Sequence, residues 1–457
     1  MTIKKPPHPP FGRSMRSQQF QFAPTYIPLN HGSFGTHPTP VREAHYALQT
    51  TAIERPDKFV SFTTYPLLAK SRSQIAPLLG VHQDEVVFVP NATTGVNTVL
   101  RNIKFEPDDV VVSFSTVYPA CEKTVASIGD FLPVKLEKVD LVYPIEDEAI
   151  LEAFKEKVKS LRGDGKRVKL AMFDTVSSFP GARLPWEQLV EICKEMEILS
   201  LIDGAHGIGM LDLTHLGKVS PDFFVSNCHK WLYTPRACAV FHVPFRNQHL
   251  IRTSLPTSHG YQFPHRPENT LGRSAFIFLF DYVATMDYTP YLCIPAALEF
   301  RTQVCGGEAK IREYCYDIAR KGGEVVAEIL GTSILTTKSE TMRQCAFANV
   351  ELPIVFKKKE EVDSSKGELD IDDAVKVAAW IKRTAAMEKD TYFQTALHAG
   401  KLWVRLSGQI YLEEDDFKWA APRLLELCER AKKGEASTFE APKLTHGDEQ
   451  TAAVIEG

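Results

Sequence analysis

The segments Leu199-Ser-Leu-Ile-Asp-Gly-Ala-His206 and Ser226-Asn-Cys-His-Lys-Trp231 decide the fold of this 457-residue chain. The first is a short apolar run that ends at Asp203, and the second follows another apolar run, residues 222–225. In an open α/β sheet the carboxyl ends of parallel strands lie at one edge, and ligands bind there. We therefore expect Asp203 and Lys230 to face the same crevice.

A lysine and a buried carboxylate in one crevice match the requirements of pyridoxal phosphate. The amine forms a Schiff base with the cofactor aldehyde, and the carboxylate keeps the pyridine nitrogen protonated so that the ring accepts electrons. A single lysine after a strand is most often a solvated loop residue. Because Lys230 is paired with Asp203, the catalytic interpretation is the stronger one.

Other polar and aromatic residues follow the predicted strand ends. His206 can reach the phenolic oxygen side of the ring and His229 the phosphate, although a single histidine is more often structural. Tyr118 could stack on the pyridine ring or seal the core, and Ser178 is a weaker candidate for the same crevice.

A helix start that could hold a phosphate follows the predicted strand 85–89. Pro90 ends the strand, and Asn91 or Thr93 can cap the next helix, whose free amides then point at the crevice. Alone this is a generic helix start. Together with the lysine motif it predicts a phosphate site formed by the Ala92 amide and Thr93.

Arg405 is the candidate for binding a substrate carboxylate. It alternates with apolar neighbours in the strand-like segment 402–406, so its side chain is half-buried and needs an anion. A substrate carboxylate and a structural salt bridge satisfy it equally well, and the spacing does not decide between them.

Composition excludes several classes of function. A hydrophobic share of 44% and a charged share of 24% are typical of an ordinary globular enzyme. The formal net charge is −4 and no strongly basic patch is present, so we expect no nucleic-acid partner. No stretch approaches the length of a membrane span, and the proline-rich N-terminus lacks the apolar core of a secretory signal.

Cysteine usage indicates the compartment. The nine cysteines are odd in number and show no CxxC spacing, which fits reduced thiols in a cytoplasmic protein; no metal site is predicted. Cys121 and Cys228 lie near the predicted crevice and could influence its reactivity. Buried apolar thiols are the commoner explanation for both.

Short apolar runs alternate with amphipathic ones, which is typical of an α/β domain with a mostly parallel sheet covered by helices. The predicted strands are 85–89, 110–114, 168–173, 199–202, 223–225 and 238–243, and a helix is predicted over 186–196. We expect a flexible N-terminal arm over 1–25, a large domain over 26–298, a smaller α+β domain over 299–433 and a disordered tail over 434–457.

Five motifs can then be compared with known families. They are Leu29-Asn-His-Gly-Ser-Phe-Gly35, Asn91-Ala-Thr-Thr-Gly95, Asp203-Gly-Ala-His206, Ser226-Asn-Cys-His-Lys230 and Val404-Arg-Leu-Ser407. Over roughly residues 26–432 the chain resembles the class V aminotransferase and cysteine desulfurase family of fold-type I pyridoxal phosphate enzymes. Within it, the chain is most similar to the branch of isopenicillin N epimerase, fungal hercynylcysteine sulfoxide lyase and the loline-alkaloid pyridoxal phosphate enzyme.

The resemblance implies a fold and a set of roles. The fold is a mostly parallel sheet of the seven-stranded type in the large domain, with a smaller α+β domain after it. Lys230 would carry the cofactor, Asp203 would pair with the pyridinium and His206 would lie beside the phenolic oxygen. Tyr118 would stack on the ring, where many relatives have histidine.

Further roles concern the phosphate and the substrate. Ala92, Thr93 and His229 would hold the phosphate. A neighbouring subunit of a homodimer would add a contact from a Gly-Thr pair, which is Ala284-Thr285 here, so this match is imperfect. Arg405 would bind the substrate carboxylate, with Asn30 and His31 lining the same pocket. The mobile cysteine loop of cysteine desulfurases has no clear counterpart, which argues against sulfur transfer to a scaffold.

The predicted function is pyridoxal phosphate chemistry on an amino acid of specialised, fungal-type metabolism. The substrate amine would displace Lys230 from the cofactor and form an external aldimine. The freed Lys230 would then act as base or acid at Cα, and Asp203 would help the ring stabilise the carbanion. We expect C–S cleavage or loline-type bond formation rather than epimerisation, and transamination least. A binding protein that has lost the chemistry is the alternative, and intact Lys230, Asp203 and Arg405 argue against it.

Overall fold

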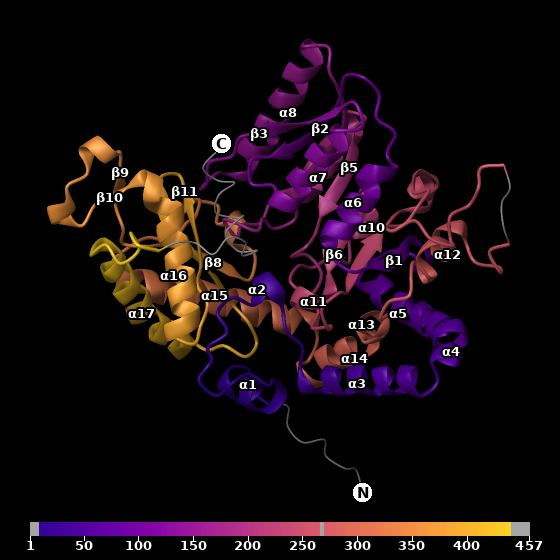
Figure 1. The fold of residues 1–457 in the computed structure, drawn as a ribbon, viewed down its shortest axis with the longest axis horizontal. Coiled ribbons are helices and arrows are strands. Elements are labelled where there is room, and N and C mark those ends of the chain that lie inside the picture. The colour runs from indigo at the N-terminus through magenta and orange to yellow at the C-terminus, as the bar shows by residue number, and fades with distance from the viewer. Residues whose placement is uncertain (1–8, 266–268, 440–457) are drawn as a thin grey trace, which may run out of the picture.

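A seven-stranded sheet forms the centre of the larger part of the chain, in a computed structural model that describes residues 9–265 and 269–439 (Figure 1). Its order is β1-β7-β6-β5-β4-β2-β3. Strand β7 runs antiparallel to β1 and β6, and the other neighbours are parallel. The strands are β1 Val86–Val89, β2 Asp109–Phe114, β3 Val134–Val139, β4 Arg167–Asp174, β5 Leu199–Asp203, β6 Phe223–Asn227 and β7 Ala239–His242. The predicted α/β class with a mostly parallel sheet is confirmed.

Helices cover both faces of this sheet, because its side chains alternate between two hydrophobic clusters. In β1, Val86 and Phe88 belong to one cluster and Val87 and Val89 to the other. The helices of the first cluster are α5 Thr64–Leu79, α8 Asp147–Gly163, α9 Trp186–Glu195, α13 Thr289–Leu292 and α14 Ile294–Glu299. Those of the second are α6 Ala92–Asn102, α7 Pro119–Gly129 and α12 Ala275–Asp281.

The smaller unit follows in the chain and lies beside the large sheet in Figure 1, coloured orange to yellow. A three-stranded antiparallel sheet of order β11-β12-β8 packs against long helices. The elements are α15 Glu308–Leu330, β8 Phe347–Glu351, β9 Phe356–Lys357, β10 Leu369–Asp370, α16 Ala374–Glu388, β11 Gln394–His398, β12 Lys401–Ser407 and α17 Glu414–Lys432. The remaining helices are α1 Arg13–Gln19, α2 His31–Phe34, α3 Thr39–Glu54, α4 Pro56–Lys58, α10 Leu216–Val219 and α11 Cys228–Trp231.

The N-terminal segment differs from the predicted flexible arm. Helix α1 buries Met15 completely, and Arg16 forms a two-bonded ion pair with Asp416 at the start of α17. The amide of Gly12 also donates to the carbonyl of Ile410. The segment from Gly12 through α1 is therefore packed on the folded C-terminal unit. Residues 1–8 of the predicted arm and 440–457 of the predicted tail lie outside the described residues.

Among the longer strands, β3 and β11 escaped the sequence patterns, for different reasons. Strand β3 is at the edge of the large sheet, and its centre carries charged, partly exposed side chains, as edge strands commonly do. Strand β11 is buried although it contains Gln394, Thr395 and His398. Thr395 satisfies its hydroxyl by donating to the carbonyl of Ala378 on α16. Polar residues with local partners hide a strand from a pattern of apolar alternation.

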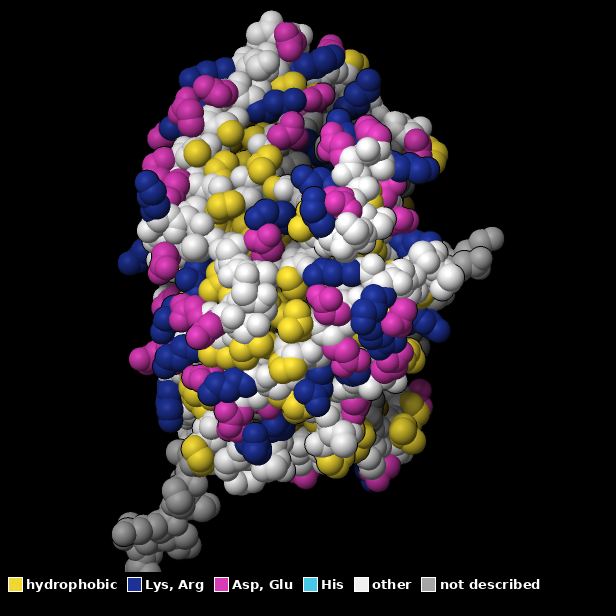
Figure 2. Space-filling view, turned by 90° about the vertical axis from the view of Figure 1, so that its left-hand side faces the viewer, with side chains coloured by type: hydrophobic (Ala, Val, Ile, Leu, Met, Phe, Trp, Pro, Cys, Tyr) yellow, Lys and Arg dark blue, Asp and Glu magenta, His cyan; other side chains and the backbone are white. Residues whose placement is uncertain are grey.

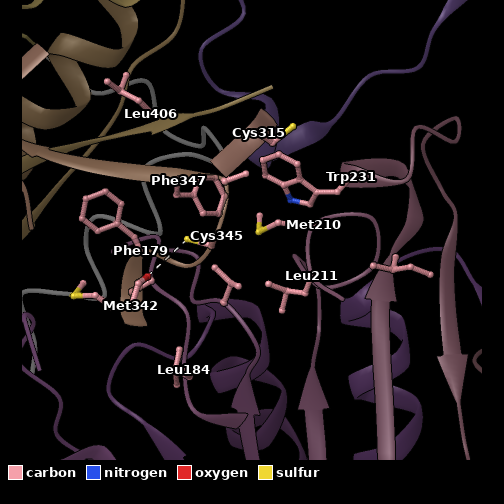
Figure 3. Close-up of a cluster of buried hydrophobic side chains, with 14 of the residues drawn as sticks. Phe179, Leu184, Met210, Leu211, Trp231, Cys315, Met342, Cys345, Phe347 and Leu406 are labelled. Carbon is pink, nitrogen blue, oxygen red and sulfur yellow. Dashed lines mark hydrogen bonds between the residues drawn. The ribbon is translucent and has the colours of Figure 1, made fainter. Parts of the chain in front are cut away.

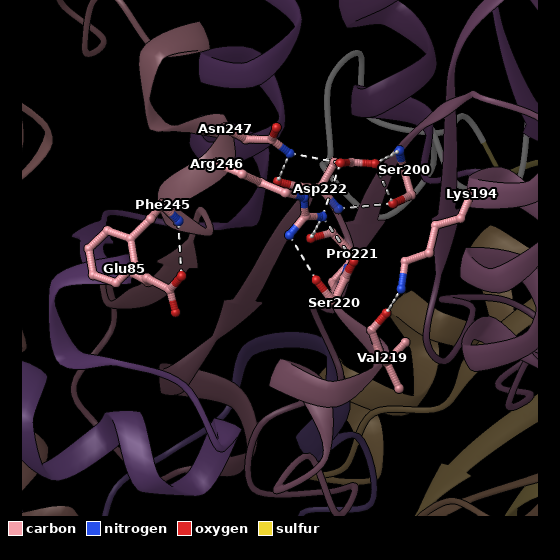
Figure 4. A network of polar contacts seen from close by, with 10 residues as sticks. All are labelled: Glu85, Lys194, Ser200, Val219, Ser220, Pro221, Asp222, Phe245, Arg246 and Asn247. Carbon is pink, nitrogen blue, oxygen red and sulfur yellow. Dashed lines mark hydrogen bonds and ion pairs between the residues drawn. The ribbon is translucent and has the colours of Figure 1, made fainter.

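A polar network holds the amino end of β6, the strand that leads to Lys230 (Figure 4). The carboxylate of Asp222 accepts from the Ser200 amide at 2.9 Å and from Asn247 Nδ2 at 2.7 Å. Arg246 Nη2 donates to the same carboxylate at 3.1 Å. These bonds tie β6 to β5 and to the segment after β7, so the start of β6 is fixed in register.

An apolar cluster joins the two units behind the carboxyl edge of the sheet (Figure 3). Phe347, the first residue of β8, contacts Trp231 edge to face at 5.5 Å between ring centroids and His206 at 5.1 Å. A Cβ at Gly32 or Gly181 would lie within 3.0 Å of the Phe347 ring. The small unit is thus packed tightly against the strand ends.

On the molecular face of Figure 2, side chains of both charge signs are interspersed with scattered hydrophobic groups. This mixture gives that face no strong field of one sign. Among the described helices, none is long and apolar enough to span a bilayer.

Candidate active site

The carboxyl ends of five strands meet at one edge of the large sheet. Strand β1 leads to the helix start at Ala92, and β2 leads to Tyr118 at the start of α7. Strand β4 ends at Asp174 and β5 at Asp203, while β6 runs directly into α11, which carries Lys230. The fold therefore brings the predicted catalytic residues together.

Lys230 has the properties of a nucleophilic amine. Its Nζ lies 3.4 Å from Nε2 of His206. Burial lowers the pKa of its amine to about 8, and the positive charge of Arg405 contributes to the lowering. A sizeable fraction of the amine is therefore uncharged near neutral pH, as attack on an aldehyde requires.

His206 is held in one tautomer. The indole Nε1 of Trp231, which can only donate, bonds to Nδ1 of His206 at 3.2 Å. Burial lowers the pKa of His206 well below its usual value, so the ring is neutral and its proton is on Nε2. That N–H points to Lys230, where the phenolic oxygen of a cofactor bound to the lysine is expected.

Asp203 and Asp174 form a buried carboxyl pair in register on β5 and β4. Asp203 accepts hydrogen bonds from the Ala205 amide at 3.0 Å and from Cys121 Sγ at 3.4 Å. Burial raises the pKa of both carboxyls, and the charge of Asp203 raises that of Asp174 further. Asp203 therefore carries the negative charge of the pair, and Asp174 holds a proton.

The two cysteines near the crevice are not exposed nucleophiles. Burial and the charge of Asp203 raise the pKa of the Cys121 thiol well above its usual value. Cys121 is thus a protonated donor to Asp203 and has a structural role beside the site. Cys228 is completely buried.

Arg405 is a buried cation without an acidic partner. Its guanidinium is 1% exposed and stacks on the ring of Phe347 at 4.5 Å, and its Nε has no bonding partner. Across the described part of the chain, no carboxylate forms an ion pair with it, and burial lowers its pKa to about 10. By contrast, the buried Arg301 is paired with Glu308. This geometry favours an external anion for Arg405 over a structural salt bridge.

Neutral groups orient this guanidinium. Arg405 Nη1 donates to the Ser178 carbonyl, and Nη2 donates to Asn30 Oδ1 at 3.2 Å and Ser33 Oγ at 2.8 Å. Asn30 and Ser178 therefore position the arginine, a more specific role than the predicted contacts with substrate or cofactor.

His31 holds the backbone of the lysine segment. Its Nε2 donates to the carbonyl of Lys230 at 2.5 Å, so Nδ1 accepts from the hydroxyl of Tyr411 at 2.7 Å. Both ring nitrogens are engaged, and the side chain is 5% exposed. These bonds differ from the predicted place of His31 in a substrate pocket and make it a positioning residue.

The phosphate-binding groups are only partly those predicted. The Ala92 amide donates to Asn227 Oδ1 at 2.8 Å, so it is not available to a phosphate in this arrangement. The next amide of α6, that of Thr93, has no acceptor among the described residues. His229 Nδ1 donates to the Cys238 carbonyl at 2.9 Å, and burial lowers the pKa of His229 to about 4. Its Nε2 would donate to a phosphate only after taking up a proton, which a dianion favours.

Tyr118 and Thr285 occupy different surroundings. Tyr118 is the residue before α7 and lies three residues before Cys121, which touches Asp203. It is therefore at the edge where a ring bound to Lys230 would lie. Thr285 is exposed, and its hydroxyl bonds to the hydroxyl of Tyr282 at 2.9 Å. Its predicted contact, with a phosphate held by a neighbouring subunit, stays a prediction.

Several residues of the site were missed from the sequence. Asn227 accepts a hydrogen bond from the Ala92 amide. Because Asn227 lies inside the recognised lysine motif, its place in the sequence could have identified it as a residue of the site. Ser33 and Phe347 come from segments far from Arg405 in sequence, and only the fold reveals that they contact it. No local pattern distinguishes Tyr411 from a core tyrosine.

The residues present fit pyridoxal phosphate. Lys230 supplies a partly uncharged amine, Asp203 a buried negative charge, and His206 an N–H fixed in direction. The start of α6 supplies the Thr93 amide and hydroxyl for a phosphate. Arg405 has unused bonding capacity for the carboxylate of an amino acid, since its Nε has no bonding partner.

Comparison with known proteins agrees with this assignment. The family model described as Aminotransferase class-V matches residues 43–256. The chain is 36% identical to the L-cysteine desulfhydrase-like protein lolT1 of Epichloe uncinata, over 92% of this chain and 96% of that protein. It is 30% identical to the hercynylcysteine sulfoxide lyase of Schizosaccharomyces pombe, over 92% and 98% of the two chains. The isopenicillin N epimerase of Streptomyces clavuligerus is 26% identical over 69% and 78%.

Solved structures share the fold. The cystine C-S lyase C-DES, in complex with its product cysteine persulfide, aligns with a TM-score of 0.70 at 17% identity, over 88% of this chain and 98% of that one. A variant of C-DES with glycine covalently linked to its pyridoxal phosphate cofactor aligns with a TM-score of 0.68 at 16% identity, over 88% and 97%. The predictions of a fold-type I architecture, of an enzyme and of pyridoxal phosphate as cofactor are confirmed. The chain belongs to the class-V aminotransferase family.

Proposed function

We propose that this protein is a pyridoxal phosphate-dependent C–S lyase that acts on a sulfur-substituted amino acid. The observation that carries the proposal is the buried, acid-free guanidinium of Arg405, which lies on β12 of the small sheet and close enough to Lys230 for its charge to lower the pKa of the lysine. Two relatives named for cysteine desulfhydrase-like and sulfoxide lyase activity match nearly the whole chain and support C–S cleavage. The isopenicillin N epimerase relative keeps epimerisation as the alternative outcome.

The roles of the residues follow from their geometry. Pyridoxal phosphate supplies an aldehyde for the lysine and a ring that accepts the electron pair from Cα. Arg405 binds the substrate carboxylate through the parts of its guanidinium that Ser178 and Asn30 leave free, and this sets the orientation of the Cα–H bond. Lys230 takes the Cα proton, for which a pKa of about 8 is well matched.

The surrounding groups keep charges in place. Asp203, charged and hydrogen-bonded to an amide and a thiol, holds the proton on the ring nitrogen. His206 donates its Nε2 proton to the phenolic oxygen, and its tautomer is maintained by Trp231. Tyr118, the residue before α7, would stack on the ring. After loss of the Cα proton the C–S bond breaks, and a thiolate or sulfenate leaves with the bonding electrons.

A cytoplasmic homodimer with shared sites is part of the proposal. Thr285 is exposed and bonds within its own loop, which leaves it accessible to the phosphate site of a neighbour. Large apolar side chains are exposed on α3 and just after it, with Tyr46 at 58%, Ile53 at 80% and Phe62 at 73% exposure, and such a group suits burial between subunits. All nine cysteines are free and buried, as expected in a reducing compartment.

Product analysis tests the proposed reaction. Purified protein is incubated with L-cysteine and with S-alkyl cysteines and their sulfoxides, and Lys230→Ala serves as the control. Pyruvate and a released sulfur compound in equal amounts support C–S cleavage. A keto acid that retains the sulfur substituent indicates transamination, unchanged mass with inverted configuration indicates epimerisation, and a coupled product indicates bond formation. Any of these three as the main product would contradict the proposal.

A further inference from the structure

A cavity of about 480 Å³ lies between the two units, lined by residues from the ends of β2 and β3, from the segment after β4 and from the turn between β11 and β12. Tyr118 and Ser178 line it, and Ser178 is also the residue whose carbonyl holds Arg405. The other walls come from the segment after β3, with Asp140, and from the turn between β11 and β12, with His398. Through Ser178 the cavity therefore adjoins Arg405, which would bind the substrate carboxylate.

The size of the cavity exceeds what a free cysteine requires. Its volume lies within the usual range of ligand pockets, about 300–1,000 Å³. A cysteine thiol would fill only the inner end, next to Tyr118. The apolar side chains of Val117, Leu141, Phe179 and Leu397 line the space beyond. Such walls suit the methylene groups of an organic substituent on sulfur.

The charges at the cavity do not cancel. Lys138 is neutralised by Glu122, whose Oε1 lies 2.6 Å from its Nζ. Burial lowers the pKa of His398, so its ring is neutral, and its Nε2 is bonded to the backbone of Tyr143. Asp140 is exposed at the mouth and forms no ion pair with any residue in the described part of the chain.

We propose that this cavity is the side-chain subsite of the enzyme and that Asp140 selects substrates whose sulfur substituent ends in a positively charged group. This inference rests on the proposed C–S lyase function and names its substrate class: S-substituted cysteines or their sulfoxides with a cationic end. The substituent passes between Tyr118 and the apolar walls, and its cation reaches the carboxylate of Asp140. Free cysteine, which makes neither contact, is a poor substrate.

The test uses two substrates of nearly equal shape. S-(2-aminoethyl)-L-cysteine carries a cation where S-propyl-L-cysteine carries a methyl group. For the wild-type holoenzyme we expect the KM of the cationic substrate to be about three- to fivefold lower, as an exposed charge pair allows. Added salt should reduce this ratio. The substitution Asp140→Asn should bring the ratio to about one while leaving the KM of the propyl substrate unchanged.

Comparing ratios between variants removes the intrinsic difference between the two leaving groups, since that difference is the same for every variant. Asp164→Asn, which removes an exposed carboxylate after α8 outside the cavity, is the matched control and should keep the wild-type ratio. Binding is measured in parallel from the change in cofactor absorbance as each substrate is added.

The outcomes separate the two proposals. An equal ratio in wild type and Asp140→Asn would overturn the subsite assignment, even if both substrates yield pyruvate. If neither substrate yields pyruvate but absorbance titrations show the charge preference and its loss in Asp140→Asn, the subsite stands and C–S cleavage fails. If binding shows no charge preference either, both proposals fail.

Discussion

The lowered pKa of Lys230 predicts how the protein takes up its cofactor. With a pKa of about 8, about one amine in four is uncharged at pH 7.5. At the ordinary lysine value of about 10.4, the fraction would be about one in a thousand. Apoprotein mixed with pyridoxal phosphate should therefore form its imine about 200-fold faster than an exposed lysine of equal reactivity. The rate should rise with pH to a half-maximum near pH 8.

The same pKa affects stability. The folded pKa of Lys230 lies below the unfolded one, so between about pH 8 and 10.4 the folded state binds fewer protons, and stability rises with pH through that window. The full difference corresponds to about 3 kcal/mol, and partial exposure of the side chain reduces it to about 2 kcal/mol. Lys230→Met should stabilise the apoprotein at pH 7 by about this amount in urea denaturation and remove the rise.

The assay follows imine absorbance after rapid mixing from pH 6.5 to 10.5, in wild type and in Arg405→Gln. Because the charge of Arg405 contributes to the low pKa, the variant should move the half-maximum to higher pH. A wild-type half-maximum near pH 10, or the same midpoint in both proteins, would refute the reasoning. Unchanged stability in Lys230→Met would refute its second part.

Five further substitutions test three features of the structure. Asp174 holds a proton, so Asp174→Asn should keep kcat/KM within about threefold, whereas Asp203→Asn should lower it by about 100-fold or more through loss of the charge at the ring nitrogen. Equal losses in the two variants would contradict this division. Gly35 has φ +63°, and a Cβ there would lie 1.8 Å from the carbonyl oxygen of His229, the residue before the catalytic lysine. Gly331 has nearly the same φ, +64°, but open space around it. Gly35→Ala should therefore lower Tm far more than Gly331→Ala. The latter should cost about 1 kcal/mol. Phe347→Ala should lower the free energy of unfolding by about 3–5 kcal/mol. It should also raise KM, because the guanidinium of Arg405 stacks on this ring and would be held less firmly for binding the substrate carboxylate. An unchanged KM would show that the ring does not support Arg405.

The central sheet could be predicted because its strands are nearly all apolar and buried on both faces. The apolar pattern fails for strands that are not made of apolar residues. Strand β3 carries charged side chains because it lies at the sheet edge, and β11 is buried although it contains polar residues, which have buried hydrogen-bond partners. The N-terminal segment was misjudged because proline content hides the few residues, such as Met15, that bury completely.

The sequence predicted which residues lie near the site, but not how their side chains are oriented or which partners they bond to. Strand ends place Asp203 and Lys230 at one edge, which follows from topology alone. Whether a carboxylate of the protein pairs with Arg405 depends on every residue packed around the guanidinium. His31 is oriented toward the backbone of Lys230 by its hydrogen bond with Tyr411, 380 positions away in the sequence. Such long-range partners have no local signal in the sequence.

The most direct test of the account is to locate the cofactor on the chain. Purified protein is reduced with borohydride, digested and mapped by mass spectrometry, with Lys230→Ala treated in the same way. We expect a yellow protein, a phosphopyridoxyl group on the peptide that contains Lys230, and no such group in the variant. A phosphopyridoxyl group on another lysine, or a colourless protein that takes up no added cofactor, would contradict the central claim.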